Sequence, residues 1–248
     1  MGDVVALVGG GGKTSLMFRL ARELTEGGNH VVTTTTTRIL PPEPEQSSCV
    51  IIEEDEEKLF TLAREAFLDC PHITLARLKP DEDKFKGLLP ETIDRLRNLK
   101  LAQYIINEAD GAARQPLKAP NPTEPVIPSS TTLVVAIVGI EALGKPLAPD
   151  IAFRVEYISQ LTGLKSGEAI TSEAMATLLT HPQGIIQHVP EKARIVPFIN
   201  KVHSAVEAAG ALTLAEEILS RQHPQIERVV FGAIKSPEKP LTIVARRE

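Results

Sequence analysis

The stretch LVGGGGKTSL, residues 7–16, constrains the fold more than any other part of the chain. Four consecutive glycines stand between an apolar run and a lysine–threonine pair. A strand, a glycine-rich turn and a helix opening on Lys-Thr form the context of a phosphate-binding loop. Glycines let backbone N–H groups converge on an anion, and the helix N-terminus adds partial positive charge. The alternative is a flexible turn with an incidental lysine.

The spacing of this loop departs from the common pattern G-x-x-x-x-G-K-[ST], which would need glycine where the chain has Leu7. The shorter form Gly9-x-x-Gly12-Lys13-Thr14 resembles the loop of the Mur-type peptide ligases, which bind ATP. In such a cradle Lys13 would neutralise β- and γ-phosphate oxygens, and the Thr14 hydroxyl would reach Mg²⁺. The predicted phosphate-binding residues are Gly9, Gly10, Gly11, Gly12, Lys13, Thr14 and Ser15.

Apolar, β-branched runs alternate with segments of helical periodicity along most of the chain, as in a covered parallel sheet. The predicted strands cover residues 4–8, 30–37, 49–52, 73–78, 102–106, 132–139, 193–200 and 226–234. The predicted helices cover residues 13–26, 55–70, about 90–100 and 203–221, and a charged loop covers 79–87. We therefore expect a three-layer α/β fold, P-loop NTPase-like, with a mostly parallel sheet and helices on both faces. A single domain is expected over residues 1–248, with a mostly helical segment at 150–190.

Composition argues against several classes of function. The formal net charge is −5 and the aromatic content is 4%, without tryptophan, so neither a nucleic-acid partner nor an anionic membrane is expected. The two cysteines lack C-x-x-C spacing, which argues against a disulfide framework or a structural zinc site. No secretory signal and no apolar run of about 20 residues is apparent, so we expect a cytoplasmic protein.

An acidic pair follows the predicted strand at 102–106. Glu108 and Asp110 alternate, so in an extended chain both carboxylates point the same way. Asp110 is the predicted metal ligand together with Thr14, and Glu108 the predicted water-orienting base; the predicted catalytic residues are Lys13, Glu108 and Asp110. The alternative is that both acids end a strand in solvent. Farther along, Arg114 and Lys118 would contact a γ-phosphate or an anionic substrate, or be surface charges.

A run of five threonines, residues 33–37, is expected on a strand. Its simplest interpretation is a strand with one hydroxylated face. A strand made mostly of threonine is expected to bury poorly, and the carboxyl ends of parallel strands line ligand crevices. We therefore favour a role in which Thr35, Thr36 or Thr37 contacts Mg²⁺ or the γ-phosphate.

Asn200 and Lys201 end the predicted strand at 193–200 and match the first half of the guanine-reading motif N-K-x-D. The fourth position is His203, so the aspartate that discriminates for guanine is absent. We expect Asn200 and Lys201 to contact the nucleotide, and ATP and GTP both stay open as ligands.

Taken in order, the motifs VGGGGKTSLM, VVTTTTTRI, EADGAARQPLKAP with EPVIP, VVAIVGIEALGKPL, LLTHPQG and INKV resemble the YqeC-type family, over residues 4–202. The resemblance implies a P-loop nucleotide-binding protein that is an accessory factor of selenium-dependent molybdenum hydroxylases. Implied partners are a molybdenum hydroxylase or other cofactor maturation proteins. The chain departs from the family at Phe153, which precedes Arg154 where a histidine is expected.

These observations leave several functions open. The first is a Mg²⁺-dependent nucleotide hydrolase or phosphotransferase that assists cofactor maturation, with switch-like motion in the loop at 108–128. A related alternative is an ATP-dependent ligase of the Mur kind, in which an acceptor replaces water. The third is a non-catalytic module that binds a nucleotide-containing form of molybdopterin cofactor, in which Glu108 would be dispensable.

Overall fold

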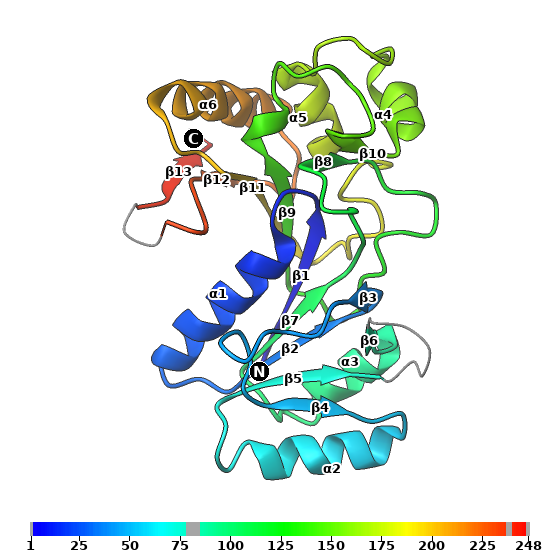
Figure 1. Cartoon of the computed structure of the whole chain (residues 1–248), viewed down its shortest axis with the longest axis vertical. Coiled ribbons are helices and arrows are strands. Elements are labelled where there is room, and N and C mark those ends of the chain that lie inside the picture. The colour runs from blue at the N-terminus through cyan, green and yellow to red at the C-terminus, as the bar shows by residue number, and fades with distance from the viewer. Residues whose placement is uncertain (1, 78–84, 237–239, 247–248) are drawn as a thin grey trace. The chain divides into compact units, whose positions relative to one another are not determined.

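The computed structural model describes residues 2–77, 85–236 and 240–246 (Figure 1). The chain divides into two compact units. The first comprises Met1–Leu7, Thr14–Asp110 and Val126–Leu133, and the second comprises Val8–Lys13, Gly111–Pro125 and Val134–Glu248. One domain over residues 1–248 therefore stays a prediction.

Parallel strands form the sheet of the first unit, in the order β1-β7-β2-β5-β4. They are β1 (Asp3–Gly9), β2 (Val31–Thr35), β4 (Val50–Ile52), β5 (His72–Ala76) and β7 (Tyr104–Glu108). Two short strands, β3 (Arg38–Ile39) and β6 (Phe85–Lys86), pair antiparallel outside this sheet. Residue alternation along these strands sends side chains to opposite faces, so each face needs its own cover.

Helices cover both faces of this sheet: α1 (Lys13–Glu26), α2 (Glu56–Ala66) and α3 (Pro90–Asn98). Ile73 and Leu75 on β5 belong to a core cluster shared with buried residues of α2 and α3. His72 points to the other face, where its ring lies 6.2 Å from that of Phe18 on α1. Alternate residues of one strand thus meet different helices, which gives three layers. Figure 1 shows α2 beside β4 and β5.

The second unit carries the strand order β13-β12-β11-β9. Its strands are β9 (Leu133–Gly139), β11 (Arg194–Asn200), β12 (Arg228–Phe231) and β13 (Thr242–Ala245), and β8 (Leu117–Lys118) pairs parallel with β10 (Ala152–Phe153). The helices are η1 (Ile140–Ala142), α4 (Val155–Thr162), α5 (Ser172–Thr180) and α6 (Ala205–Ser220). Strands β11 and β12 are parallel, whereas β13 is antiparallel to β12.

These strands belong to one nine-stranded, mostly parallel sheet, which confirms the predicted α/β fold with helices. Strand β13 was not predicted, because its apolar run, residues 243–245, is shorter than the roughly four residues by which a strand is recognised, and the strand lies largely exposed at the sheet edge. Both cysteines are free. None of the helices in the described ranges is long and apolar enough to cross a membrane.

The prediction of a mostly helical segment at 150–190 is wrong. Only α4 and α5, of 8 and 9 residues, are helical there. Gly163 ends α4 in a left-handed conformation with φ 77°, and Gly167 follows with φ 88°. These glycines interrupt the helix that the apolar periodicity predicted. Of the charged loop predicted at 79–87, residues 79–84 lie outside the described residues, and Phe85–Lys86 form β6.

The threonines of β2 are buried, contrary to the expectation that such a strand buries poorly: all of β2 is buried. The Thr33 hydroxyl bonds to the Thr74 hydroxyl at 2.8 Å and to Nε2 of His72 at 2.9 Å. The Thr34 hydroxyl donates to the Leu75 carbonyl oxygen at 2.8 Å. Each hydroxyl finds a partner on the neighbouring strand, which offsets the cost of burial.

His72 generates a prediction about pH. Burial lowers the pKa of His72 from 6.5 to about 4. Between these values the unfolded chain binds more protons at this site, so the free energy of unfolding falls as the pH drops from 6.5 toward 4. We expect the wild-type protein to lose about 1–2 kcal/mol more than His72→Asn over this interval, measured by urea unfolding. Identical pH dependence in the two proteins would contradict this.

Candidate functional site

The glycine loop connects β1 to α1, and Figure 1 shows strand, loop and helix following one another in blue. Gly11 and Gly12 have φ angles of 83° and 133°, which L side chains rarely adopt. A Cβ atom on Gly11 would lie 2.5 Å from the Gly139 amide nitrogen, and one on Gly12 would lie 2.5 Å from Nδ2 of Asn200. The run of glycines is therefore required by backbone geometry and by close approach, which an incidental flexible turn would not need.

Hydrogen bonds fix the loop to its surroundings within the second unit. The Gly10 amide donates to the Ile137 carbonyl at 2.9 Å, and the Gly11 amide donates to the Gln115 carbonyl at 3.0 Å. Asn200 holds the same loop from β11: its Nδ2 donates to the Gly11 carbonyl at 2.6 Å. The loop is thus a preformed turn.

The Asn200 side chain is buried, with 4% of its surface exposed. Besides its bond to Gly11, its Oδ1 accepts a hydrogen bond from the Ile234 amide at 3.1 Å. Both ends of the amide group thus contact backbone atoms. The geometry gives Asn200 a structural task that the sequence did not reveal, because both partners are distant along the chain.

Lys13 is the first residue of α1 and is buried, with 5% of its surface exposed. Its Nζ donates to the Gly9 carbonyl at 2.5 Å, so the ammonium group folds back over the loop. The first turn of α1 holds no acidic residue. Positive charge from the lysine and from the helix N-terminus therefore adds at the loop, an arrangement that favours an anion.

Thr14 and Glu108 meet in the first unit although 94 residues separate them. The Thr14 hydroxyl donates to Oε2 of Glu108 at 2.8 Å. Thr35 lies opposite Glu108 in the register of β2 and β7, and its hydroxyl donates to the Glu108 carbonyl at 2.8 Å. Two predicted groups thus converge on the end of β7.

The oxygen atoms of Thr14 and Glu108 are the hard donors that Mg²⁺ prefers, and this cation commonly uses one or two protein ligands beside phosphate and water. The described residues contain no group of three or more His, Cys, Asp or Glu side chains able to hold a metal ion by themselves. The oxygen atoms of Thr14 and Glu108 are therefore better suited to a cation that is also bound by phosphate than to a structural metal ion held by protein side chains alone.

Asp110 lies two residues beyond Glu108, in the turn that follows β7, and only 1% of its surface is exposed. Burial distinguishes it from a solvated acid at a strand end. The Ala109 amide, between the two acids, donates to the Leu7 carbonyl of β1 at 3.0 Å and extends the β1–β7 contact to this turn.

The remaining threonines, Thr36 and Thr37, make hydrogen bonds around the end of β2, and the Thr37 hydroxyl lies 3.2 Å from the Thr35 hydroxyl. The Thr36 hydroxyl donates to the Val126 carbonyl at 2.7 Å, and the Thr37 amide donates to the Thr35 hydroxyl at 3.0 Å. The roles predicted for Thr35, Thr36 and Thr37 toward a ligand stay predictions. In this structure the three side chains shape the turn after β2.

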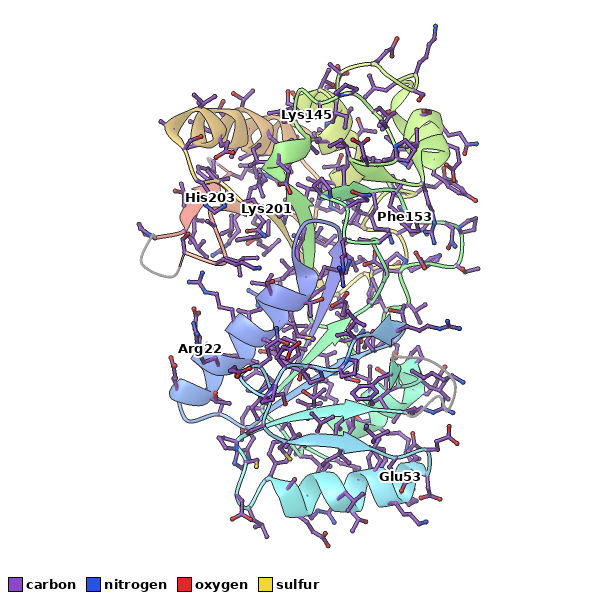
Figure 2. The ribbon with its side chains drawn as sticks, viewed as in Figure 1. Arg22, Glu53, Lys145, Phe153, Lys201 and His203 are labelled. Atoms are coloured by element: carbon purple, nitrogen blue, oxygen red, sulfur yellow. The ribbon has the colours of Figure 1, made fainter. Side chains whose placement is uncertain are left out.

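Three predicted basic residues differ in their surroundings. Arg114 is exposed, with φ 64°. Lys201 pairs with Glu141 of η1, and Figure 2 places Lys201 and His203 just past the end of β11. Lys118 is buried with no exposed surface and bonds to Glu124, so the surface-charge alternative for Lys118 is wrong.

Comparisons with known proteins give the following matches. The model of the family described as YqeC protein matches residues 5–156. "Uncharacterized protein YqeC" of Escherichia coli strain K12 is 32% identical over 244 residues, which cover 98% of this chain and 91% of that protein.

Two solved structures are similar to the chain. Hydrogenase maturation factor HypB from Archaeoglobus fulgidus has 12% identity and a TM-score of 0.44, with 95% of this chain and 83% of that chain covered. FtsY from Mycoplasma mycoides has 10% identity and a TM-score of 0.32, with 99% of this chain but only 64% of that chain covered.

The anchoring role of Asn200 can be tested by stability. Asn200→Ala removes two buried hydrogen bonds, to the Gly11 carbonyl and from the Ile234 amide, so we expect a loss of about 2–3 kcal/mol in the free energy of unfolding. Asn29→Ala is the matched control, because Asn29 also donates to a backbone carbonyl, Leu24, but at a helix end. We expect that control to lose less than about 1 kcal/mol in urea unfolding. Equal losses would contradict the anchoring role.

Proposed function

The chain belongs to the YqeC family, and we propose that it binds a Mg²⁺–nucleoside triphosphate at the loop of residues 9–14. The observation that carries the proposal is the contact between Thr14 and Glu108. A helix-opening threonine next to the lysine of a glycine loop meets a carboxylate from the neighbouring parallel strand, at 2.8 Å. This is the pairing of hydroxyl and acid that a magnesium–phosphate site requires.

The phosphates would bind at the start of α1. The amide groups of the first helical turn have no intrahelical partner and point toward the loop. Lys13 would exchange its bond to the Gly9 carbonyl for phosphate oxygens, which are charged acceptors and form the stronger hydrogen bond. Glycines 9–12 let the phosphates approach the backbone.

The Mg²⁺ would be held by the Thr14 hydroxyl together with Asp110, directly or through water. When bound, the cation would neutralise the charge that develops on the phosphate oxygens. Glu108 then serves two tasks, because its carboxylate holds Thr14 and can also accept a proton from an attacking water. The buried Asp110 is the second acid of the site.

For the reaction, we propose hydrolysis or phosphoryl transfer in support of the maturation of selenium-dependent molybdenum hydroxylases. The family resemblance supports the biological setting, and the two acids at and just beyond the end of β7 support the chemistry. The preformed loop is equally compatible with a Mur-like ligase or with a module that binds a nucleotide-containing molybdopterin cofactor without turnover. These alternatives differ in the molecule that accepts the phosphoryl group and in whether Glu108 acts as a general base.

The purine base of the nucleotide would lie near Lys201 and His203. We propose that Asn200 positions the loop, since both ends of its amide contact backbone atoms, and that Lys201 packs near the base. With histidine at position 203, no aspartate of an N-K-x-D motif favours guanine. ATP and GTP are therefore the two ligands to compare.

The first test is nucleotide affinity. We expect Lys13→Ala to weaken the binding of Mg²⁺–ATP or Mg²⁺–GTP at least about 100-fold, or about 2.7 kcal/mol, in calorimetric titration, because a buried charged donor is lost. Lys145→Ala is the control, an exposed lysine labelled in Figure 2, and should bind like the wild type. Unchanged affinity in Lys13→Ala would refute the phosphate cradle.

The second test separates an enzyme from a binding module. Glu108→Gln keeps the shape and an acceptor for Thr14 but removes the base, so phosphate release should fall about 100-fold or more while affinity changes less than about threefold. The exposed Glu54→Gln is the control. Turnover retained in Glu108→Gln would remove Glu108 as the base, and binding without turnover in the wild type would favour the binding module.

A further inference from the structure

The segment 111–125 follows Asp110 and is held by buried charges. Lys118 on β8 has no exposed surface, and its Nζ donates to the Gly111 carbonyl at 2.6 Å and to Oε2 of Glu124 at 3.0 Å. Arg154, just before α4, donates to the same Glu124 oxygen at 2.7 Å. We call Lys118, Glu124 and Arg154 the Lys118 network.

Other contacts fix the same segment. Gln187 donates to the carbonyls of Asn121 and Glu124, and the His188 ring bonds to the Pro125 carbonyl at 3.2 Å. The β8–β10 pair joins Lys118 to Phe153 in register, and Figure 2 labels Phe153. These contacts, all within the second unit, fit a rigid segment better than the switch-like loop expected at 108–128.

The energetics of the Lys118 network point to a geometric role. Burying an ammonium group is costly, and a buried ion pair is often no more stabilising than apolar side chains of the same volume. Burial alone would raise the pKa of Glu124, but its hydrogen bonds and the charges of Arg154 and Lys118 outweigh burial and lower it. The lowered pKa keeps the Glu124 carboxylate charged at neutral pH, where it accepts hydrogen bonds from both basic side chains.

Gly111 is the residue whose backbone conformation the Lys118 network fixes. It directly follows Asp110, and a Cβ placed on Gly111 would meet no heavy atom of the described residues within 4 Å. Steric contact therefore does not define its conformation. The bond from Lys118 to its carbonyl orients the peptide one residue beyond the buried acid.

We propose that Lys118 is a positioning residue that orients Asp110 for Mg²⁺ by fixing the Gly111 peptide. The inference rests on the proposed function. It gives Lys118 a role other than the phosphate contact predicted from sequence, since its ammonium bonds to Gly111 and Glu124. Without this bond the Gly111 peptide rotates more freely, and the Asp110 carboxylate samples orientations that do not favour the cation.

The test is a titration of Mg²⁺ at fixed nucleotide, with nucleotide affinity as the readout. Lys118→Met removes the donor and the charge but keeps the length, and should raise the Mg²⁺ concentration for half-maximal tightening about tenfold or more, as for other groups that orient metal ligands. Arg154→Met is the matched control: it removes the other cation from Glu124 but leaves the Gly111 bond, so the midpoint should shift less than about threefold.

A double variant distinguishes positioning from general destabilisation. If Lys118 acts through Asp110, then Lys118→Met combined with Asp110→Asn should shift the midpoint no further than Asp110→Asn alone. Additive shifts, or equal shifts in Lys118→Met and Arg154→Met, would overturn the inference. If Lys118→Met does not fold, Lys118→Gln takes its place under the same criteria.

Failure of this inference is separable from failure of the proposed function. A wild-type protein that binds no nucleotide, or binds it without regard to Mg²⁺, overturns the proposed function and the inference with it. A wild-type protein with a clear Mg²⁺ midpoint, together with an unshifted Lys118→Met, overturns only the positioning role.

Discussion

The site depends on the close approach of the glycine loop to the backbone around it. A Cβ on Gly10 would lie 2.7 Å from the Gln115 carbonyl oxygen, and one on Gly11 would lie 2.5 Å from the Gly139 amide nitrogen. Because no side chain fits there, the loop holds a single turn that ends at the N-terminus of α1. Lys13 and Thr14 are thereby placed at the first helical turn, where amide groups and positive charge gather.

Charged and hydroxyl side chains singled out from the sequence are paired within their own units. Lys13 folds over its own loop, Thr14 bonds to Glu108, and Thr35 bonds to the backbone of Glu108. Buried polar groups of this kind are costly unless they are paired. In the first unit, Thr14 and Thr35 both bond to Glu108 at the end of β7.

Local signals predicted much of this structure. Glycine spacing and apolar periodicity predicted β1, the loop and α1, since those features depend on neighbouring residues. The Thr14–Glu108 contact requires β7 to lie beside β1, and no local pattern specifies strand order. Burial of Lys118 was missed for the same reason, because its carboxylate partner Glu124 is also bonded to Arg154, which lies on a different element. The exposed edge strand β13 was missed because its apolar run, residues 243–245, is short.

The most direct measurement is the NMR spectrum of protein labelled with [¹⁵N]glycine, recorded with and without Mg²⁺–nucleotide. The chain has 16 glycines, and Gly12 lies at the predicted phosphate site. We expect the amide signals of glycines 9–12 to shift strongly when ATP or GTP is added, while that of Gly163 at the end of α4 stays in place. Unmoved loop signals at saturating nucleotide would contradict the phosphate cradle.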